Sequence, residues 1–429
     1  MIILRDHIDL RKLPLSYRQI DYAVNSDAFV NLSEGSVRSG KTASGLLRWL
    51  KFVNSAPKKG DLVVCAKTYD TATRNIFNPL REHPLFGRAV AKSTSYTRGA
   101  PTAQILGRTV EVVTFNDERA EGRLRGMTAA GGYVDEWSLM PRSFNDQLIA
   151  RCSVDGAQLF GNTNPDNPRH WLKKDYINEA RPGGRVDGDW KIWKFLLDDN
   201  PSLSEKIKDR YRRQFVGLWY KRMILGQWVA AEGAVYETWD PARHVVTSKQ
   251  MPAIVRWLSL GVDYGTTNPF AALMLGLGAD GRLYLTNEWR WDSRKQQRSL
   301  TDAQYSQRLR AWLVDIGIVP EWTVVDPSAA SFIAQLHNDG VTPYRADNSV
   351  IDGIRLIASL LAAGLLLVHE SCEGWIEEAP GYTWDQKAAD EGRDEVIKLG
   401  DHSLDAGRYA IKTTQALWQG NLLDLEAAA

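Results

Sequence analysis

Hydrophobic residues in the first half of the chain come in short runs, which are bounded by glycine, asparagine or charged residues and separated by longer amphipathic segments. In the segment after the first run, Leu46, Leu50 and Val53 fall on one face of a helix that we predict over 41–53. Short strands that alternate with helices are typical of an α/β domain with a mostly parallel sheet. The runs that we predict to be strands are 29–32, 61–66, 109–115, 131–135 and 157–160.

The second half of the chain follows a different pattern. Three apolar runs, 257–264, 269–275 and 282–288, lie close together and are joined by turn residues, which predicts a meander of antiparallel strands. Helical and strand patterns then alternate. Antiparallel strands followed by such an alternation are the order of a ribonuclease H-like fold. We predict these later elements to be helices at 300–314, 350–361 and from residue 401, and strands at 322–326 and 365–369.

The length of the chain and its two patterns predict the domain organisation. A chain of 429 residues exceeds what one typical core supports, so two domains are expected. We predict an α/β domain over 1–235 with a helical lid at about 185–230, and a second domain over 253–420. A linker that contains glycine and proline would occupy 236–252, and residues 421–429 would form a tail.

The composition, with 44% hydrophobic and 24% charged residues, is ordinary for a soluble globular protein. No apolar run is long enough to span a membrane, and the first residues lack the segments of a signal peptide. Cys65, Cys152 and Cys372 are scattered without metal-ligand spacing, as is typical of a reducing compartment. We therefore expect a cytoplasmic protein with no membrane partner.

The net charge of +1 means that a polyanion would have to be held by local patches of the surface. Lysines and arginines gather at 205–222, where only Glu205 and Asp209 oppose them. Such a run is usually a solvated helix face. It becomes a candidate polyanion contact only beside other motifs for that chemistry.

Residues 35–42 have the phosphate-binding spacing G-x-x-x-x-G-K-T, between an apolar run and an amphipathic segment. In such a P-loop, backbone N–H groups wrap the phosphates, the lysine adds positive charge, and the threonine hydroxyl ligates Mg²⁺. The helix that follows points the positive end of its dipole at the anion. The motif predicts a site for ATP and Mg²⁺ that is formed by Gly35, Ser36, Arg38, Ser39, Gly40, Lys41 and Thr42.

Two acids, Asp135 and Glu136, follow the apolar run that ends at Val134. With a P-loop upstream, Asp135 is expected to hold Mg²⁺ through water, and Glu136 to activate the water that attacks the γ-phosphate. Without the P-loop, the pair would be interpreted as exposed acids at the end of a strand.

Two less specific signals fit the same site. Gln19 could read the adenine through its amide, with Tyr17 near the base. Thr163, in the polar segment 161–165 after the next strand, could sense the γ-phosphate and relay its loss. The alternative for this segment is a plain Asn-Pro turn.

An arginine that reaches the γ-phosphate would raise the rate of hydrolysis, by roughly 10³–10⁵ in known cases. Arg125, shortly before the acid pair, is one candidate, and Arg38 inside the loop is its rival. We expect Arg125 to act between neighbouring subunits.

Three aspartates in the second half lie at the ends of predicted elements. Asp263 and Asp326 each end an apolar strand, and Asp405 lies in the first turn of the last helix. Any one of them alone is more often a turn or cap residue than a ligand. Carboxylates that converge from separate elements, however, can hold two metal ions about 3.5–4 Å apart, and hard oxygen ligands suit Mg²⁺ or Mn²⁺. The set predicts a two-metal nuclease with Asp263, Asp326 and Asp405 as catalytic ligands.

Three nearby residues each have two possible roles. Asp401 shares a helix face with Asp405 and could be a ligand or the helix cap. His402 could support a ligand or handle a proton. Glu288, at the end of the third meander strand, could complete the metal shell or be an exposed acid.

Over residues 14–415, the chain resembles the large terminase subunit of tailed bacteriophages. The resemblance implies an N-terminal ATPase of the additional-strand type with a small helical lid, and a C-terminal ribonuclease H-like nuclease. The features that carry it are the P-loop at 35–42, Arg125 before Asp135 and Glu136, the segment 161–165, Asp263, Asp326, and Asp401, His402 and Asp405.

The resemblance also implies partners and a location. The subunit would form a homo-oligomeric ring, with five subunits expected, on the portal of a procapsid, and could be a monomer in isolation. It would pump double-stranded DNA into the procapsid and cut it at initiation and termination, with a small terminase subunit supplying DNA recognition. These events take place in the cytoplasm of the bacterial host, where the subunit attaches transiently to the procapsid.

Two other classes of function remain open. One is a helicase-like DNA translocase with a C-terminal domain that does not cut, against which the lack of recognisable helicase motifs after residue 170 argues. The other is a scaffold without enzymatic activity, whose nucleotide site only gates assembly. Nucleotide binding without turnover would favour that scaffold.

Overall fold

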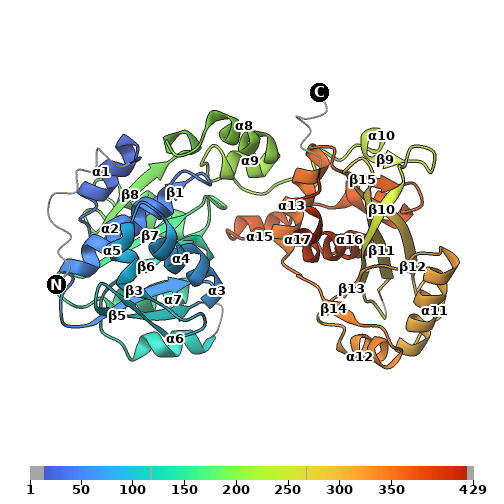
Figure 1. The fold of residues 1–429 in the computed structure, drawn as a ribbon, viewed down its shortest axis with the longest axis horizontal. Coiled ribbons are helices and arrows are strands. Elements are labelled where there is room, and N and C mark those ends of the chain that lie inside the picture. The colour runs from blue at the N-terminus through green and yellow to red at the C-terminus, as the bar shows by residue number, and fades with distance from the viewer. Residues whose placement is uncertain (1–13, 116–117, 267, 423–429) are drawn as a thin grey trace. The chain divides into compact units, whose positions relative to one another are not determined.

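The computed structural model describes residues 14–115, 118–266 and 268–422. The chain folds into two compact units (Figure 1). Unit 1 comprises Met1–Ala230 together with Ala389–Arg393, and unit 2 comprises Ala231–Ala388 together with Asp394–Ala429. In the described part of the chain, no helix is long and apolar enough to cross a membrane.

The sheet of unit 1 has the strand order β3-β4-β5-β2-β6-β7-β1-β8. From β5 to β8 all neighbours are parallel, and β3 and β4 add an antiparallel edge. The carboxyl ends of the parallel strands therefore lie along one edge of the sheet. The strands are β1 (Val30–Gly35), β2 (Asp61–Ala66), β3 (Thr94–Ser95), β4 (Thr102–Ile105), β5 (Arg108–Thr114), β6 (Ala129–Val134), β7 (Gln158–Thr163) and β8 (Trp190–Phe195).

Helices cover both faces of this sheet, and each face has its own hydrophobic core. Leu46 and Trp49 of α2 pack with Phe77 on one face, and Leu124 of α6 packs with Phe144 of α7 on the other. The helices of unit 1 are α1 (Tyr17–Asn25), α2 (Lys41–Ser55), α3 (Tyr69–Ala72), η2 (Thr73–Phe77), α4 (Asn78–Glu82), α5 (Gly87–Lys92), α6 (Glu118–Arg125), η3 (Trp137–Leu139), α7 (Arg142–Arg151), η4 (Lys173–Ile177), η5 (Asn178–Ala180), η6 (Leu197–Asp199), α8 (Glu205–Gln214) and α9 (Gly217–Met223).

The segment predicted as a helical lid at about 185–230 is helical only in its later part. Its early part forms β8, which pairs in parallel with β1 and extends the sheet. Trp190 and Phe195, at the two ends of β8, are buried and anchor this edge strand, whereas the residues between them are half-buried or exposed. The lid is thus reduced to α8 and α9.

Unit 2 is built on a sheet with the order β14-β13-β10-β11-β12-β15-β9. The meander β10-β11-β12 is antiparallel, and β13 joins β10 in parallel, as expected for the ribonuclease H-like order. The strands are β9 (Val245–Val246), β10 (Ile254–Asp263), β11 (Phe270–Gly278), β12 (Leu283–Trp291), β13 (Trp322–Val325), β14 (Pro343–Arg345) and β15 (Leu366–His369).

Helix α16 lies directly on the meander, against β10 and β11. Gly261 of β10 makes this close approach possible, because a Cβ atom there would lie 2.0 Å from the carbonyl oxygen of Ala406. Tyr305 of α11 and Phe332 of α12 pack against the other face. The helices of unit 2 are α10 (Pro241–His244), α11 (Asp302–Asp315), α12 (Ala330–Asn338), α13 (Val350–Ala362), α14 (Glu373–Glu378), η7 (Ala379–Gly381), α16 (His402–Thr413) and α17 (Gln415–Trp418), and α15 (Gln386–Asp390) spans the boundary of the two units at Ala388.

The segment 236–252, predicted as a linker, is part of unit 2. The rings of Tyr236 and Trp239 pack against Trp375, at centroid distances of 6.1 and 4.7 Å. Strand β9, in the same segment, pairs with β15. Aromatic burial and strand pairing therefore fix a segment whose glycine and proline content suggested a hinge. Of the predicted tail, residues 423–429 lie outside the described residues.

Candidate functional sites

The P-loop connects the carboxyl end of β1 to the first turn of α2, as the sequence predicted. Gly35, Arg38 and Gly40 have positive φ angles of 135°, 54° and 86°, which curl the backbone between strand and helix. The ammonium group of Lys41 lies inside this curl, and its Nζ donates to the carbonyl oxygens of Gly35 at 3.1 Å and Ser36 at 2.5 Å. Such a loop is shaped to surround a phosphate.

Lys41 is buried, and burial lowers its pKa to about 7, while the carboxylates of Glu136 and Glu34 oppose the shift. Burial disfavours an ammonium ion that lacks a nearby counter-charge. A phosphate in the loop would supply that charge. The electrostatics of the loop therefore suit an anionic ligand.

Asp135 and Glu136 follow β6 at the same edge of the sheet. Asp135 is buried, and its two carboxylate oxygens accept hydrogen bonds from Asn75 at 2.8 Å and Asn162 at 3.1 Å. Burial raises the pKa of Asp135, and the two amide hydrogen bonds oppose this. Glu136 is half-buried and has a φ angle of 52°, which turns the chain sharply after the strand.

The polar segment after β7 joins these groups into one network. Besides Asp135, Asn162 contacts the Tyr133 hydroxyl at 2.9 Å and accepts from the Glu136 backbone N–H at 3.3 Å. The amide oxygen of Asn164 accepts from Lys41 Nζ at 3.1 Å. Thr163 is buried and accepts from the backbone N–H of Ser138 at 3.1 Å. This segment is therefore more than a plain turn, because it links the acid pair to the P-loop lysine.

Gln19 lies against the P-loop, but its amide is engaged within the protein. It is buried, its Nε2 donates to the carbonyl of Ser39 at 3.1 Å, and its Oε1 accepts from the backbone N–H of Ser16 at 2.9 Å. Gln19 thus braces the loop and caps α1, and its contact with adenine stays a prediction. Tyr17 is 83% exposed, so its ring is open to a ligand.

The two candidate arginine fingers lie at opposite edges of the unit 1 sheet. Arg38 is exposed on the P-loop itself, with its guanidinium 6.0 Å from the ring centroid of Tyr211 in α8. Arg125 is exposed at the end of α6, and three residues later the Thr128 carbonyl accepts from the N–H of Asp61 at 2.8 Å. Asp61 begins β2, so Arg125 lies toward the amino ends of the parallel strands, away from its own P-loop.

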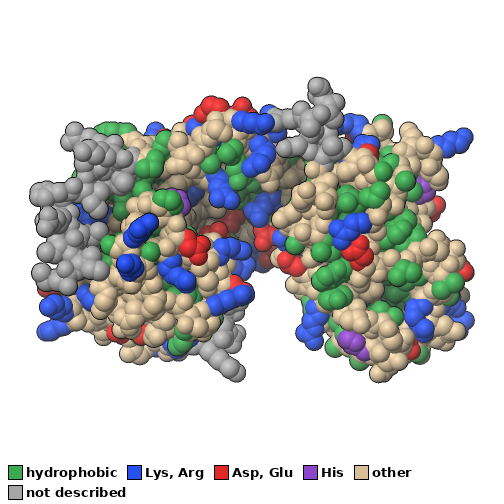
Figure 2. Space-filling view, viewed as in Figure 1, with side chains coloured by type: hydrophobic (Ala, Val, Ile, Leu, Met, Phe, Trp, Pro, Cys, Tyr) green, Lys and Arg blue, Asp and Glu red, His purple; other side chains and the backbone are tan. Residues whose placement is uncertain are grey.

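The basic run at 205–222 is less available to a polyanion than its sequence suggested. Lys208 is buried and pairs with Glu205 at 2.9 Å, and Arg212 pairs with Asp209 at 2.5 Å. Arg222 is buried too, within hydrogen-bond distance of Asp166. Figure 2 shows acidic and basic side chains side by side over the region of α8 and α9. Two cations of the run, Lys208 and Arg222, are therefore withdrawn into the fold, whereas Lys206, Arg210, Arg213 and Lys221 stay exposed.

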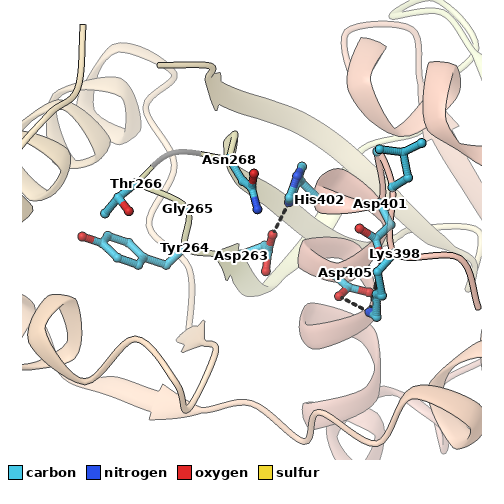
Figure 3. A pocket seen from close by; sticks show the side chains of 11 residues that line it. Asp263, Tyr264, Gly265, Thr266, Asn268, Lys398, Asp401, His402 and Asp405 are labelled. Carbon is cyan, nitrogen blue, oxygen red and sulfur yellow. Dashed lines mark hydrogen bonds and ion pairs between the residues drawn. The ribbon is translucent and has the colours of Figure 1, made fainter. Parts of the chain in front are cut away.

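In unit 2, the three predicted acids come together beside the sheet. Asp263 ends β10 and Asp326 follows β13, and these two strands are parallel neighbours. The backbone N–H of Asp326 donates to the carbonyl of Val262 at 3.2 Å. Asp405 projects from the first turn of α16, and with Asp263 it lines a pocket of about 410 Å³ (Figure 3). The helix–sheet packing at Gly261 positions this third acid.

Asp263 and His402 form a coupled pair, with His402 Nδ1 2.9 Å from Asp263 Oδ2. Burial raises the pKa of Asp263 to about 6, the hydrogen bond from His402 opposes this, and the charges of Asp405 and Asp326 add to it. For His402, burial lowers the pKa, but the hydrogen bond and charge of Asp263 outweigh it, so that the pKa is raised overall. Burial is thus the main reason that the ionised form of Asp263 is disfavoured, and the neighbouring acids add to this.

Each carboxylate oxygen of Asp405 is bonded to a cationic side chain. Arg408 Nη2 lies 2.7 Å from its Oδ1, and Lys398 Nζ lies 3.1 Å from its Oδ2. Within the described ranges, no three His, Cys, Asp or Glu side chains are arranged as a ready metal-ligand group. The donor set nevertheless fits a divalent metal, since it consists of hard carboxylate oxygens.

Comparison with known proteins identifies the family of the chain. Residues 32–240 match the family model "Terminase large subunit, T4likevirus-type, N-terminal". The structure of the large terminase from the thermophilic bacteriophage D6E is similar over 95% of this chain and 100% of that chain, with 33% identity and a TM-score of 0.85. The chain belongs to the large terminase family. A D6E structure in complex with ATP-γ-S matches 94% of this terminase and 100% of its own chain, with 33% identity and a TM-score of 0.83.

A relative from Escherichia phage T5, named "Terminase, large subunit", is 25% identical to this terminase over 224 residues. The match covers 50% of the present chain and 49% of the T5 protein, so the chain spans about half the length of that curated relative.

Around the acid cluster of this terminase, the structure decides between the alternatives for Glu288 and Asp401. Both carboxylate oxygens of Glu288 are engaged, one by the Ser403 hydroxyl and one by the Gly374 N–H at 2.7 Å. Asp401 occupies the N-cap position of α16, but its side chain makes no capping hydrogen bond and instead pairs with Lys398 at 3.2 Å. The side chain of Glu378 accepts from the backbone N–H of Ser403 at 2.7 Å and so caps the helix.

Several functional candidates of this terminase were not singled out from the sequence. Two of them, Asn75 and Glu378, lie far along the chain from the motifs that they contact. The other two contact Asp405 from nearby: Lys398 from the loop before α16, and Arg408 from the next turn of the helix. Only the i, i+3 spacing of Asp405 and Arg408 was a signal available in the sequence.

Proposed function

We propose that this terminase is a viral DNA-packaging motor, which uses ATP hydrolysis to move double-stranded DNA into a procapsid and a metal-dependent endonuclease to cut it. The observation that carries the proposal is the pairing of two sites on one chain. In unit 1, Asn162 and Asn164 link the acids after β6 to the P-loop lysine. In unit 2, Asp263, Asp326 and Asp405 gather beside α16.

At the ATP site, Lys41 would contact the β- and γ-phosphates, and the Thr42 hydroxyl would ligate Mg²⁺, with Asp135 holding the ion through water. Glu136 would act as the general base toward the attacking water. Loss of the γ-phosphate would change the contact between Lys41 and Asn164. That change gives the segment after β7 a physical way to sense hydrolysis.

Arg125 would complete the ATP site of a neighbouring subunit, because its own P-loop lies at the opposite edge of the sheet. Arg38, on the loop itself, would contact phosphate within its own subunit. The proposal therefore includes a ring of subunits, for which five is the expected number, seated on the portal of a procapsid. A small terminase subunit would select the DNA, and assembly would occur in the cytoplasm of the bacterial host.

At the nuclease site, Asp263, Asp326 and Asp405 would hold Mg²⁺ or Mn²⁺. Bound metal would activate a water and stabilise the leaving oxygen of the phosphodiester. His402 fixes the orientation of Asp263 through their hydrogen bond, and the Tyr409 hydroxyl does the same for Asp326 at 3.1 Å. Both acids are therefore oriented before metal binds.

The test is plasmid cleavage by the full chain with Mn²⁺, comparing the wild type with Asp326→Ala. We expect cleavage to require the metal, to stop in EDTA, and to fall roughly 100-fold or more in the variant, because a metal ligand is lost. Asp339→Ala is the matched control. Asp339 follows α12, and its carboxylate accepts a hydrogen bond from Ser306 at 2.6 Å instead of facing the acid cluster. That control should cut like the wild type.

Cleavage that survives Asp326→Ala would refute the assignment of the metal ligands. A folded wild-type chain that never cuts, but turns over ATP on DNA, would point instead to a translocase with a non-cutting second domain.

A further inference from the structure

Lys398 lies in the pocket of the acid cluster, in the segment that leads into α16. Its Nζ atom is 3.2 Å from a carboxylate oxygen of Asp401 and 3.1 Å from one of Asp405 (Figure 3). A single ammonium group therefore bridges two carboxylates of the site. A cation is stabilised at this position, because a third carboxylate, that of Asp263, lies in the same pocket.

The two cations on Asp405 differ in how firmly they are held. The Arg408 side chain is 2% exposed, lies on α16 itself, and stacks over the Tyr409 ring with its guanidinium carbon 4.9 Å from the centroid. The Lys398 side chain is 53% exposed and sits two residues before Gly400, whose φ angle is +64°. Arg408 thus fixes Oδ1 of Asp405, whereas the ion pair at Oδ2 can open without unpacking the core.

We propose that Lys398 is a stand-in cation, which neutralises Asp405 Oδ2 and Asp401 in the metal-free protein and is displaced when a divalent metal binds. The inference rests on the metal site of the proposed function. It explains why the described residues contain no ready group of three ligands: one oxygen of Asp405 is bonded to Arg408, and the other to an exchangeable lysine.

Exchange makes a quantitative prediction. When a ligand must first displace an internal partner, its affinity is multiplied by the fraction of molecules in which that partner is already displaced. If Lys398 is paired in about nine molecules of ten, removing its charge raises the affinity for metal about 10-fold. The same removal leaves the carboxylates unbalanced when no metal is present.

The experiment measures Mn²⁺ binding to the full chain by calorimetry for the wild type, Lys398→Met and Lys295→Met. Lys295 is an exposed lysine of the same unit outside the pocket, so its variant should match the wild type. Asp326→Ala serves as the blank, since it should lose the Mn²⁺ bound at the acid cluster but keep any ion bound elsewhere. We expect Lys398→Met to bind Mn²⁺ about 10-fold more tightly at the site that this blank lacks.

A second measurement is the melting temperature in EDTA and in saturating Mn²⁺. Lys398→Met should melt lower than the wild type in EDTA, and Mn²⁺ should raise its melting temperature by more than it raises that of the wild type. Because the rise from EDTA to Mn²⁺ is measured within each protein, the comparison remains valid if Lys398→Met is partly destabilised.

Equal or weaker Mn²⁺ affinity in Lys398→Met, with the binding still lost in Asp326→Ala, would overturn the role of Lys398 alone. Mn²⁺ binding that is the same in Asp326→Ala and in the wild type would overturn the proposed metal site itself.

Discussion

The two sites of this terminase hold their acids in different ways. In unit 1, Asp135 accepts hydrogen bonds from neutral amides, those of Asn75 and Asn162. In unit 2, Asp405 is held by the charged groups of Lys398 and Arg408. Neutral amides can orient a carboxylate without competing for its charge, whereas cations compete with any metal that must bind there.

Under the proposed function, the difference implies that the ATP site is preorganised and that the nuclease site would have to be activated. A motor that hydrolyses ATP repeatedly gains from fixed polar groups, since they need no rearrangement in each cycle. A nuclease that must cut only at the start and end of packaging gains from a site whose metal affinity is held down. The predictions below test this contrast.

The largest effect is expected for Glu136→Gln, which replaces the proposed general base by an amide of the same shape. ATP turnover should fall by roughly 10²–10⁴, the range that a positioned base contributes. Phosphate release measures it, and Mn²⁺-dependent plasmid cleavage should be unchanged. Glu82→Gln, at an exposed residue of α4, should behave like the wild type in both assays. Loss of both activities in Glu136→Gln would contradict the independence of the two sites.

Asn162→Ala removes the amide that contacts both Asp135 and the backbone of Glu136. ATP turnover should fall by about 10- to 100-fold, as is typical when a group that orients a metal-holding carboxylate is lost. Steady-state ATPase assays with a melting curve separate this effect from unfolding. Asn25→Ala is the control, because the exposed side chain of Asn25 donates to Asp21 at the end of α1, away from the acid pair. Full activity in Asn162→Ala would show that the amide network is dispensable.

Asp263→Asn should stabilise the metal-free protein while abolishing cleavage. The folded pKa of Asp263 is raised to about 6, so its ionised form is disfavoured in the native state. The cost is fully present above pH 6, declines as the pH falls from 6 to 4, and is lost below the ordinary pKa of 3.8. In EDTA at pH 7.5, urea unfolding should therefore show a gain of roughly 1–3 kcal/mol, based on 1.36 kcal/mol per pKa unit.

The gain should vanish below about pH 3, where both the native and the unfolded forms of the wild-type carboxyl are largely protonated, because its ordinary pKa is 3.8. Asp315→Asn, at the exposed end of α11, should show no gain at either pH. An Asp263→Asn protein less stable than the wild type at pH 7.5 would argue against the raised pKa of Asp263.

The smallest expected effect is proton uptake on ATP binding. Burial lowers the pKa of Lys41 to about 7, so at pH 8 most molecules carry a neutral lysine. A bound phosphate raises that pKa, and binding should take up at most about one proton at pH 8 and much less at pH 6. Calorimetry in two buffers of different ionisation enthalpy measures the uptake, with EDTA present so that Asp135 stays free of metal. Equal uptake at both pH values would exclude Lys41 as its source.

Most of the sheet in unit 1 could be predicted, because its buried strands are short apolar runs between clear breaks. The exceptions are β3 and β4 at the antiparallel edge, which were not predicted, and β8, which was assigned to the lid. Strand β8 has buried ends but exposed lysines, and no local pattern reveals that it pairs with β1, more than 150 residues away. The segment 236–252 was misjudged in the same way, since its aromatic contacts lie far along the chain.

The sequence by itself determined which groups are the candidates for chemistry at both sites. A P-loop needs a fixed local spacing, and Asp263, Asp326 and Asp405 lie at element ends that hydrophobic patterns reveal. Only the tertiary structure decided how those groups are held. Asn75 and Asn162 meet Asp135 from other elements of unit 1, and Lys398 reaches Asp405 from a preceding loop. Such contacts depend on the packing of separate elements, which a local spacing does not encode.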